Sequence, residues 1–72
     1  MGNNDIDEIR KLLSHWIEHN AEYAPEFREW AERVQQAGKD SAAQGIVFAA
    51  NALETATEAL QAALRQLGGP LE

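Results

Sequence analysis

The sequence predicts an all-α fold, an antiparallel helical hairpin, and three observations lead to it. Apolar residues recur at alternating steps of three and four along two long segments, as they do on one side of an α-helix. The stretch "GKDS", residues 38–41, interrupts this pattern once. The stretch "GGP", residues 68–70, follows the second segment and carries the glycine and proline typical of the region just beyond a helix end. Two helices joined by a short turn account for the whole pattern.

The first helix is predicted over about residues 6–37. Asp5 is followed three residues later by Glu8, which indicates a capping box at the helix start. With Ile6 taken as position a of a heptad, nine of the ten a and d positions are apolar or aromatic. Positions a are Ile6, Leu13, Asn20, Phe27 and Val34, and positions d are Ile9, Trp16, Tyr23, Trp30 and Ala37. Such a regular pattern indicates a long amphipathic helix.

Pro25 lies inside this first helical segment. A proline in a helix interior removes one backbone hydrogen bond and clashes with the carbonyl four residues earlier, at a cost of about 3 kcal/mol. The heptad phase nevertheless continues unchanged past it, whereas a true loop would usually reset the phase. We therefore expect one continuous helix that is kinked at Pro25. The alternative is a three-helix bundle in which the first break falls at residues 20–24.

The second helix is predicted over about residues 41–67, after a turn at 38–41 and before a flexible C-terminal tail. Ser41 and Gln44 form a second possible capping box, and Gly38 suits the left-handed conformation that ends the preceding helix. The heptad restarts with Ile46, Leu53, Leu60 and Leu67 at a, and with Ala49, Ala56 and Ala63 at d. The alanines at d complement the large d side chains of the first helix, so we expect them to pack together.

The 72 residues form one small domain, 1–72, that we expect to need a partner. The hydrophobic core of so small a domain rarely contributes more than about 3–5 kcal/mol to the free energy of unfolding. A chain without cysteine cannot add disulfides to this stability. Apolar residues also extend beyond a and d, which makes each apolar stripe wider than one hairpin buries. We therefore expect a homodimer that forms a four-helix bundle. The residues expected in its core or interface are Ile9, Leu13, Trp16, Ile17, Asn20, Tyr23, Phe27, Trp30, Val34, Ile46, Phe48, Leu53, Leu60 and Leu64.

Two other ways to cover the apolar stripes stay open: a bent three-helix monomer, and docking onto a different protein. The charge of the chain narrows the classes of partner. The net charge is −6, with 12 acidic and 6 basic residues, so nucleic acid and anionic membrane surfaces are disfavoured. No apolar run approaches the roughly 20 residues of a membrane span, and "MGNNDIDE" does not resemble a signal peptide. We expect a cytoplasmic protein with no nucleic-acid or membrane partner.

A polar layer is expected near the middle of the bundle. Folding the chain about Lys39 places Asn20 opposite the segment 55–58, with Thr57 as its natural neighbour. The Tyr23 hydroxyl, Thr55 and the carbonyl that Pro25 leaves free would join it. A buried asparagine at position a often fixes the register and oligomeric state of a coiled coil. The alternative interpretation is a small polar pocket for a ligand.

His15 and His19 form the one candidate metal site in the sequence. Their spacing of four residues places both imidazoles on one helix face, as ligation of nickel or zinc would require, and Glu22 continues the same edge. The same spacing is also found in histidines that only pack against neighbours or face solvent. The sequence contains no catalytic triad order, no glycine-rich phosphate loop and no Glu-x-x-His pair, so we expect no enzyme activity.

The stretch "LLSHWIEHNAEYAPEFREWAERV" resembles a small, uncharacterised helical family of prokaryotes with an HWIEHN-type motif. The resemblance covers about Leu12 to Val34; the second helix is similar only in being rich in alanine. It is carried by His15, Trp16, Ile17, His19, Asn20, Phe27, Trp30 and Ala31. It implies a possible association with a nickel-binding accessory protein of the carbon-monoxide-dehydrogenase type. A third histidine of that family falls on Tyr23 here, and an acidic position falls on Pro25.

These patterns together predict a protein of unknown function that acts as a non-enzymatic, homodimeric helical assembly or interaction module, without a cofactor. The alternative is a divalent-metal-binding accessory domain that uses His15 and His19 to hold nickel or zinc.

Overall fold

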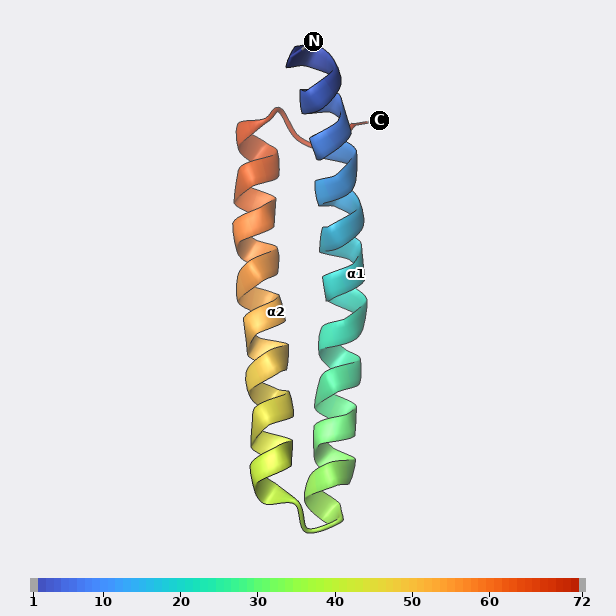
Figure 1. Cartoon of the computed structure of the whole chain (residues 1–72), viewed down its shortest axis with the longest axis vertical. Coiled ribbons are helices and arrows are strands. Elements are labelled where there is room, and N and C mark those ends of the chain that lie inside the picture. The colour runs from blue at the N-terminus through green and yellow to red at the C-terminus, as the bar shows by residue number, and fades with distance from the viewer. Residues whose placement is uncertain (1, 72) are drawn as a thin grey trace.

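The computed structural model of the protein describes residues 2–71. Two α-helices, α1 (Gly2–Gln36) and α2 (Asp40–Gln66), run antiparallel and are joined by a short turn (Figure 1). The hairpin measures 53 × 16 × 16 Å between its Cα atoms, so it is a single layer of two long helices. The all-α hairpin predicted from the heptads is confirmed. Neither described helix has the length and hydropathy needed to cross a membrane.

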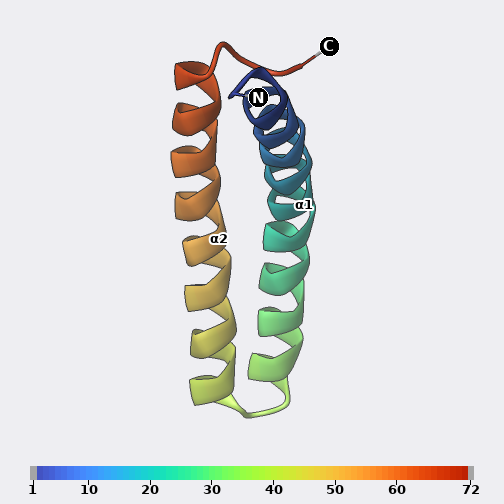
Figure 2. The ribbon, with the colours of Figure 1, turned by 45° about the horizontal axis from the view of Figure 1, so that its top comes forward.

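α1 runs through Pro25 without a break, and Figure 2 shows it curving gently along its length. The three-helix alternative is therefore not adopted. Pro25 is exposed, so the backbone carbonyl that it leaves without a partner lies at the solvent side of the helix. α1 also begins at Gly2, earlier than predicted, and Asp5 lies inside its first turn. The predicted cap at Asp5 is thus wrong, but a carboxylate in the first turn still interacts favourably with the helix dipole.

Glycines in the left-handed conformation end both helices, as predicted. Gly38 has φ = 87° and Gly68 has φ = 104°. At each end the glycine N–H and the next N–H donate backward to helix carbonyls: Gly38 to Gln35 at 2.9 Å and Lys39 to Val34 at 3.1 Å, and Gly68 to Arg65 at 3.1 Å and Gly69 to Leu64 at 2.9 Å. This pair of bonds is the Schellman motif, which satisfies the last carbonyls of a helix.

The start of α2 differs from the prediction. Lys39 occupies the N-cap position, no side chain caps the helix, and Ser41 already lies inside it. The expected Ser41–Gln44 capping box is therefore not formed, because the Schellman turn at Gly38 brings the chain directly into the first helical residue, Asp40.

Arg10 fastens the C-terminal segment to α1. Its Nε donates to the carbonyl of Gly69 at 2.8 Å, and its Nη2 donates to the carbonyl of Pro70 at 3.3 Å. Asp7 lies 3.9 Å from Nη1 of the same guanidinium. The segment that follows α2 thus lies across α1, and Leu71 is half-buried; Glu72 lies outside the described residues. This contact between Arg10 and the C-terminal segment was not predicted from the residue pattern.

The two helices contact each other through heptad positions a and e, not a and d. The buried side chains are Leu13, Ala24, Ala31, Ala43, Ala50 and Leu64. Five of these six occupy position e, and four of the six are alanines. Alanines let two helix backbones approach closely, and a tryptophan between them would force the helices apart.

The expectation that Trp16, Tyr23 and Trp30 pack between the two helices of one chain is therefore corrected. These side chains lie outside the contact, and 42%, 43% and 55% of their surfaces stay exposed. Phe48, which was also expected in the core or interface, is 75% exposed. Most a positions, among them Phe27, Ile46 and Leu53, are half-buried. The hairpin by itself leaves most of its large apolar side chains partly in water.

Candidate functional site

One broad side of the hairpin is built from position d of both helices, and we name it the apolar face. Because the helices are antiparallel and turn a and e toward each other, their d positions emerge on the same side. The apolar face consists of Ile9, Trp16, Tyr23 and Trp30 from α1 and Ala42, Ala49, Ala56 and Ala63 from α2. No a or d position along either helical heptad carries a charge. One helix supplies the large side chains of this face, and the other supplies small ones.

A groove crosses the apolar face near the turn. It is lined by Phe27 and Trp30 from α1 and by Ala42, Gly45, Ile46 and Ala49 from α2. A Cβ atom added at Gly45 would meet no heavy atom within 4 Å, so the groove is open above this residue. The groove offers an apolar, uncharged surface on which a large side chain could rest.

A row of rings runs obliquely along α1, from His15 and His19 beside the apolar face to Tyr23 within it and Phe27 at its groove. The ring centroids of His15 and His19 are 4.6 Å apart, those of His19 and Tyr23 are 5.3 Å apart, and those of Tyr23 and Phe27 are 6.4 Å apart. The guanidinium of Arg33 lies 4.8 Å from the ring centre of Trp30. The spacing of four residues keeps successive rings on one side of the helix. The histidines therefore continue an aromatic surface.

The histidine pair offers a metal two imidazoles. His15 is exposed and His19 is half-buried. Within residues 2–71 no three His, Asp or Glu side chains come together as possible metal ligands. Glu22 thus does not complete a three-ligand site with the two histidines in a single chain.

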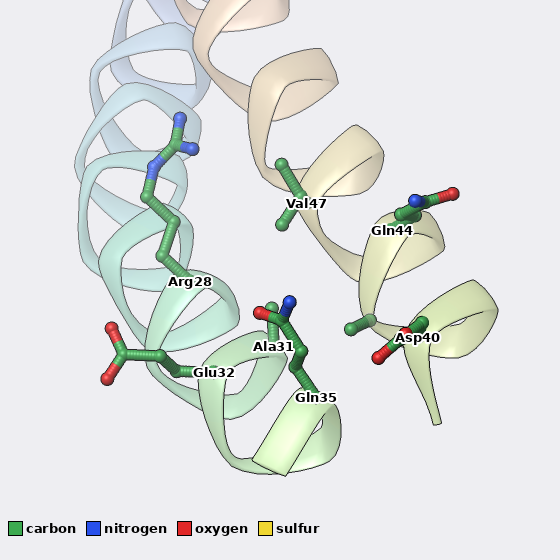
Figure 3. Close-up of a pocket in the computed structure, with 8 residues that line it drawn as sticks. Arg28, Ala31, Glu32, Gln35, Asp40, Gln44 and Val47 are labelled. Atoms are coloured by element: carbon green, nitrogen blue, oxygen red, sulfur yellow. The ribbon is translucent and has the colours of Figure 1, made fainter. Parts of the chain in front are cut away.

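The opposite side of the hairpin, the polar face, is built from position b of both helices and includes Arg28, Gln35, Asp40, Val47 and Glu54. Nη2 of Arg28 donates to Glu54 Oε1 at 2.6 Å and to Asn51 Oδ1 at 3.0 Å, which bridges α1 to α2. A shallow depression lies between Arg28 and the turn (Figure 3). In Figure 3 Arg28 extends away from Asp40 and Glu32 points away from α2. The depression is open and its charged groups do not converge on one point.

The predicted register of the hairpin agrees with the middle of the structure. Asn20 and Thr57 line the same shallow hollow on the polar side, together with Pro25. The Thr57 hydroxyl donates to the carbonyl of Leu53 at 2.7 Å, within its own helix. The predicted polar layer is only partly formed, because Tyr23 belongs to the apolar face and Thr55 lines an outward hollow beside Phe48.

The sequence interpretation missed Arg28 and the alanines at position e. Arg28 was not predicted to connect the helices, although it bridges α1 to α2. The alanines at e recur with the heptad, at Ala24 and Ala31 in α1 and at Ala43 and Ala50 in α2. This regular recurrence on both helices was the signal that could have identified the contact within the chain.

The fold and this face define a class: small two-helix proteins that expose one apolar face without charged residues at its a and d positions. Within that class, the chain belongs to the family described as a domain of unknown function (DUF8180), whose model matches residues 9–67. The match covers α1 from residue 9, the turn and all of α2, and it agrees with the expected membership of an uncharacterised family. No curated protein and no solved structure matches the chain.

Proposed function

We propose that the protein is a non-enzymatic assembly module that pairs with a second copy of itself through the apolar face. The observation that carries this proposal is the contrast between a minimal core and an uncharged face bearing Trp16, Tyr23 and Trp30. A monomer that leaves these rings half-exposed forgoes most of the hydrophobic free energy that its sequence could provide.

The energetics of one hairpin favour a partner. Among the residues whose burial the structure describes, two leucines are buried, and burial of a leucine contributes about 1.5–3 kcal/mol. A second copy on the apolar face would bury the a residues, which now have one open side, together with the aromatic d residues. The two copies would then share one core of four helices.

The apolar face also has the area that a stable dimer needs. The 27 residues of α2 span about 40 Å at about 1.5 Å per residue. Two adjacent helices, each about 10 Å across with its side chains, make the face about 20 Å wide. The resulting area of about 800 Å² equals the share that each partner contributes to a standard stable interface.

Sedimentation equilibrium tests the proposal, with runs in chelator and in nickel or zinc. We expect twice the mass of the chain in all of them, together with a melting temperature that rises with protein concentration. A monomeric mass throughout would overturn the homodimer. A monomer that binds hydrophobic dyes would instead point to docking on a different protein.

Binding of a divalent metal is the second candidate function, and the 4.6 Å separation of the His15 and His19 rings favours it. Nickel and zinc accept imidazole nitrogen, and the chain could then serve as an accessory domain that carries the metal. Calorimetric titration with nickel tests this function. Micromolar affinity that weakens at low pH and is lost when both His15 and His19 are replaced by alanine would support it, because protons compete for the same nitrogens. Unchanged affinity in the double variant would overturn it.

A further inference from the structure

The apolar face contains a size pattern that determines how two copies can fit. Contacts between α1 and α2 show which of their residues lie at the same position along the long axis of the hairpin. We call this position the height of a residue. Trp30 lies at the height of Gly45 and Ala49, because all three line one groove. Asn20 lies at the height of Thr57, and Arg10 at that of Gly69. Moving seven residues toward the C-terminus of α1 therefore changes the height by the same amount as moving seven residues toward the N-terminus of α2.

Each large d residue of α1 thus has a pair of small residues at its own height on α2. Trp30 corresponds to Gly45 and Ala49, Tyr23 to Ala52 and Ala56, and Trp16 to Ala59 and Ala63. All of the small residues except Ala49 are exposed in the single chain. The match repeats three times in succession.

Two symmetric arrangements would bring two apolar faces together. With the two-fold axis along the helices, α1 of one copy faces α2 of the other and all heights are kept. With the two-fold axis across the helices, α1 faces α1 and the heights are reversed. Trp16 would then meet Trp30 of the second copy, Tyr23 would meet its own equivalent, and the alanines of the two α2 helices would face each other.

The size pattern favours the first arrangement. Neighbouring helices pack at 8–10 Å according to the size of the side chains between them. Rings facing rings would hold one pair of helices far apart, while alanines facing alanines would need the other pair close together. Rings facing alanines fill both seams equally, at the density of a protein interior.

We therefore propose that two copies pair with the two-fold axis along the bundle, so that each aromatic d residue rests on the small pair of the other copy. This inference rests on the proposed dimer and adds its geometry. Both turns then lie at one end of the bundle. The two histidine pairs lie on diagonally opposite helices, so they do not meet.

Distance measurement between single spin labels tests the arrangement, and the absence of natural cysteine makes labelling specific. In a Lys39→Cys variant the label sits in the exposed turn. We expect a label separation of about 20–30 Å, set by the width of a four-helix bundle and the label linkers. With the axis across the helices, the two turns would lie at opposite ends, separated by about the 53 Å length of the hairpin. A Glu18→Cys label, near the middle of α1, should give a short distance in both arrangements and is the matched control.

The outcomes separate this inference from the proposed function. A short Lys39→Cys distance supports it. A long distance in a protein of dimeric mass overturns the arrangement and leaves the dimer intact. A monomeric mass overturns both.

A swap of side-chain sizes gives an independent measurement on folded protein. Ala56→Leu adds bulk where Tyr23 of the other copy would rest, so it should raise the dimer dissociation constant about tenfold. Adding Tyr23→Leu should restore most of the affinity, because the second change provides the space. If the two effects simply add, Tyr23 and Ala56 do not meet in the dimer and the arrangement is wrong.

Discussion

The apolar face and the polar face are made by the same two helices but hold them together in different ways. On the polar face Arg28 bridges α1 to Glu54 and Asn51 of α2, and the bridge satisfies charges that water would otherwise solvate. On the apolar face no such bridge exists between the described d residues, and the rings of α1 stand beside the alanines of α2 without filling the space between them. On the polar face a single chain supplies both partners of the bridge, whereas Trp16, Tyr23 and Trp30 of the apolar face stay 42%, 43% and 55% exposed in the described chain. This difference shows that two helices can pair in a specific register while their large apolar side chains remain partly exposed to water.

The largest expected effect follows from a charge placed on the apolar face. Tyr23→Glu would bury a carboxylate in the dimer, so we expect it to raise the dissociation constant by at least about a hundredfold. Val47→Glu is the matched control, because it places the same charge on an exposed apolar residue of the polar face. Sedimentation velocity over a concentration series measures both variants. If both variants raised the dissociation constant equally, the apolar and polar faces would not differ in their contribution to the dimer.

Trp30→Ala should have the next largest effect. If the dimer buries this ring, its removal should lower the free energy of unfolding by about 3–5 kcal/mol, as truncation of aromatic core residues does. The 55% exposure of Trp30 in the isolated hairpin would permit only a minor loss. Urea denaturation at high protein concentration measures the difference. An unchanged midpoint would show that the apolar face stays open.

Pro25→Ala tests the polar side of α1. The structure has a continuous helix through Pro25, where proline costs up to about 3 kcal/mol, so alanine should stabilise the protein by about 1–3 kcal/mol. Thermal melting followed by circular dichroism measures the gain. Loss of stability would indicate that Pro25 begins a separate helix, as the three-helix alternative required.

Arg28→Ala should have the smallest effect. The side chains of Arg28 and Glu54 are 40% and 55% exposed, and exposed ion pairs contribute about 0.2–1 kcal/mol at most. We expect a loss near the lower end of that range that disappears in high salt. The dimer dissociation constant should not change, which distinguishes this bridge from Trp30. A loss as large as that of Trp30→Ala would contradict the ranking of the two faces.

The hairpin, its two glycine caps and its register could be predicted from the sequence because each depends on local chemistry. The left-handed turns need glycine, and the uninterrupted heptad phase carries α1 through Pro25. The first residues of the helices were harder to predict from the sequence. Nothing in the local sequence distinguishes a capping serine from a serine that follows a tight Schellman turn, as Ser41 does.

The choice between positions d and e could not be made from residue types alone. Most a, d and e positions of both helices are apolar, and three adjacent apolar stripes can form either of two seams. The structure uses e within the chain because its alanines allow close approach of the helices, which leaves d for another contact. The spacing of four residues does place the rings of His15 and His19 side by side, but spacing alone cannot show whether Glu22 joins them, since ligation depends on where side chains converge.

The contact of Arg10 with Gly69 and Pro70 has a consequence for anything joined to the chain. The antiparallel hairpin brings both ends of the described chain to one end of the molecule, and this contact holds the segment after α2 against the first turns of α1 (Figure 1). The turn at Gly38 projects from the other end. Polypeptides fused at either terminus would therefore emerge at the same end of the hairpin. The turn would be the part of the protein farthest from them.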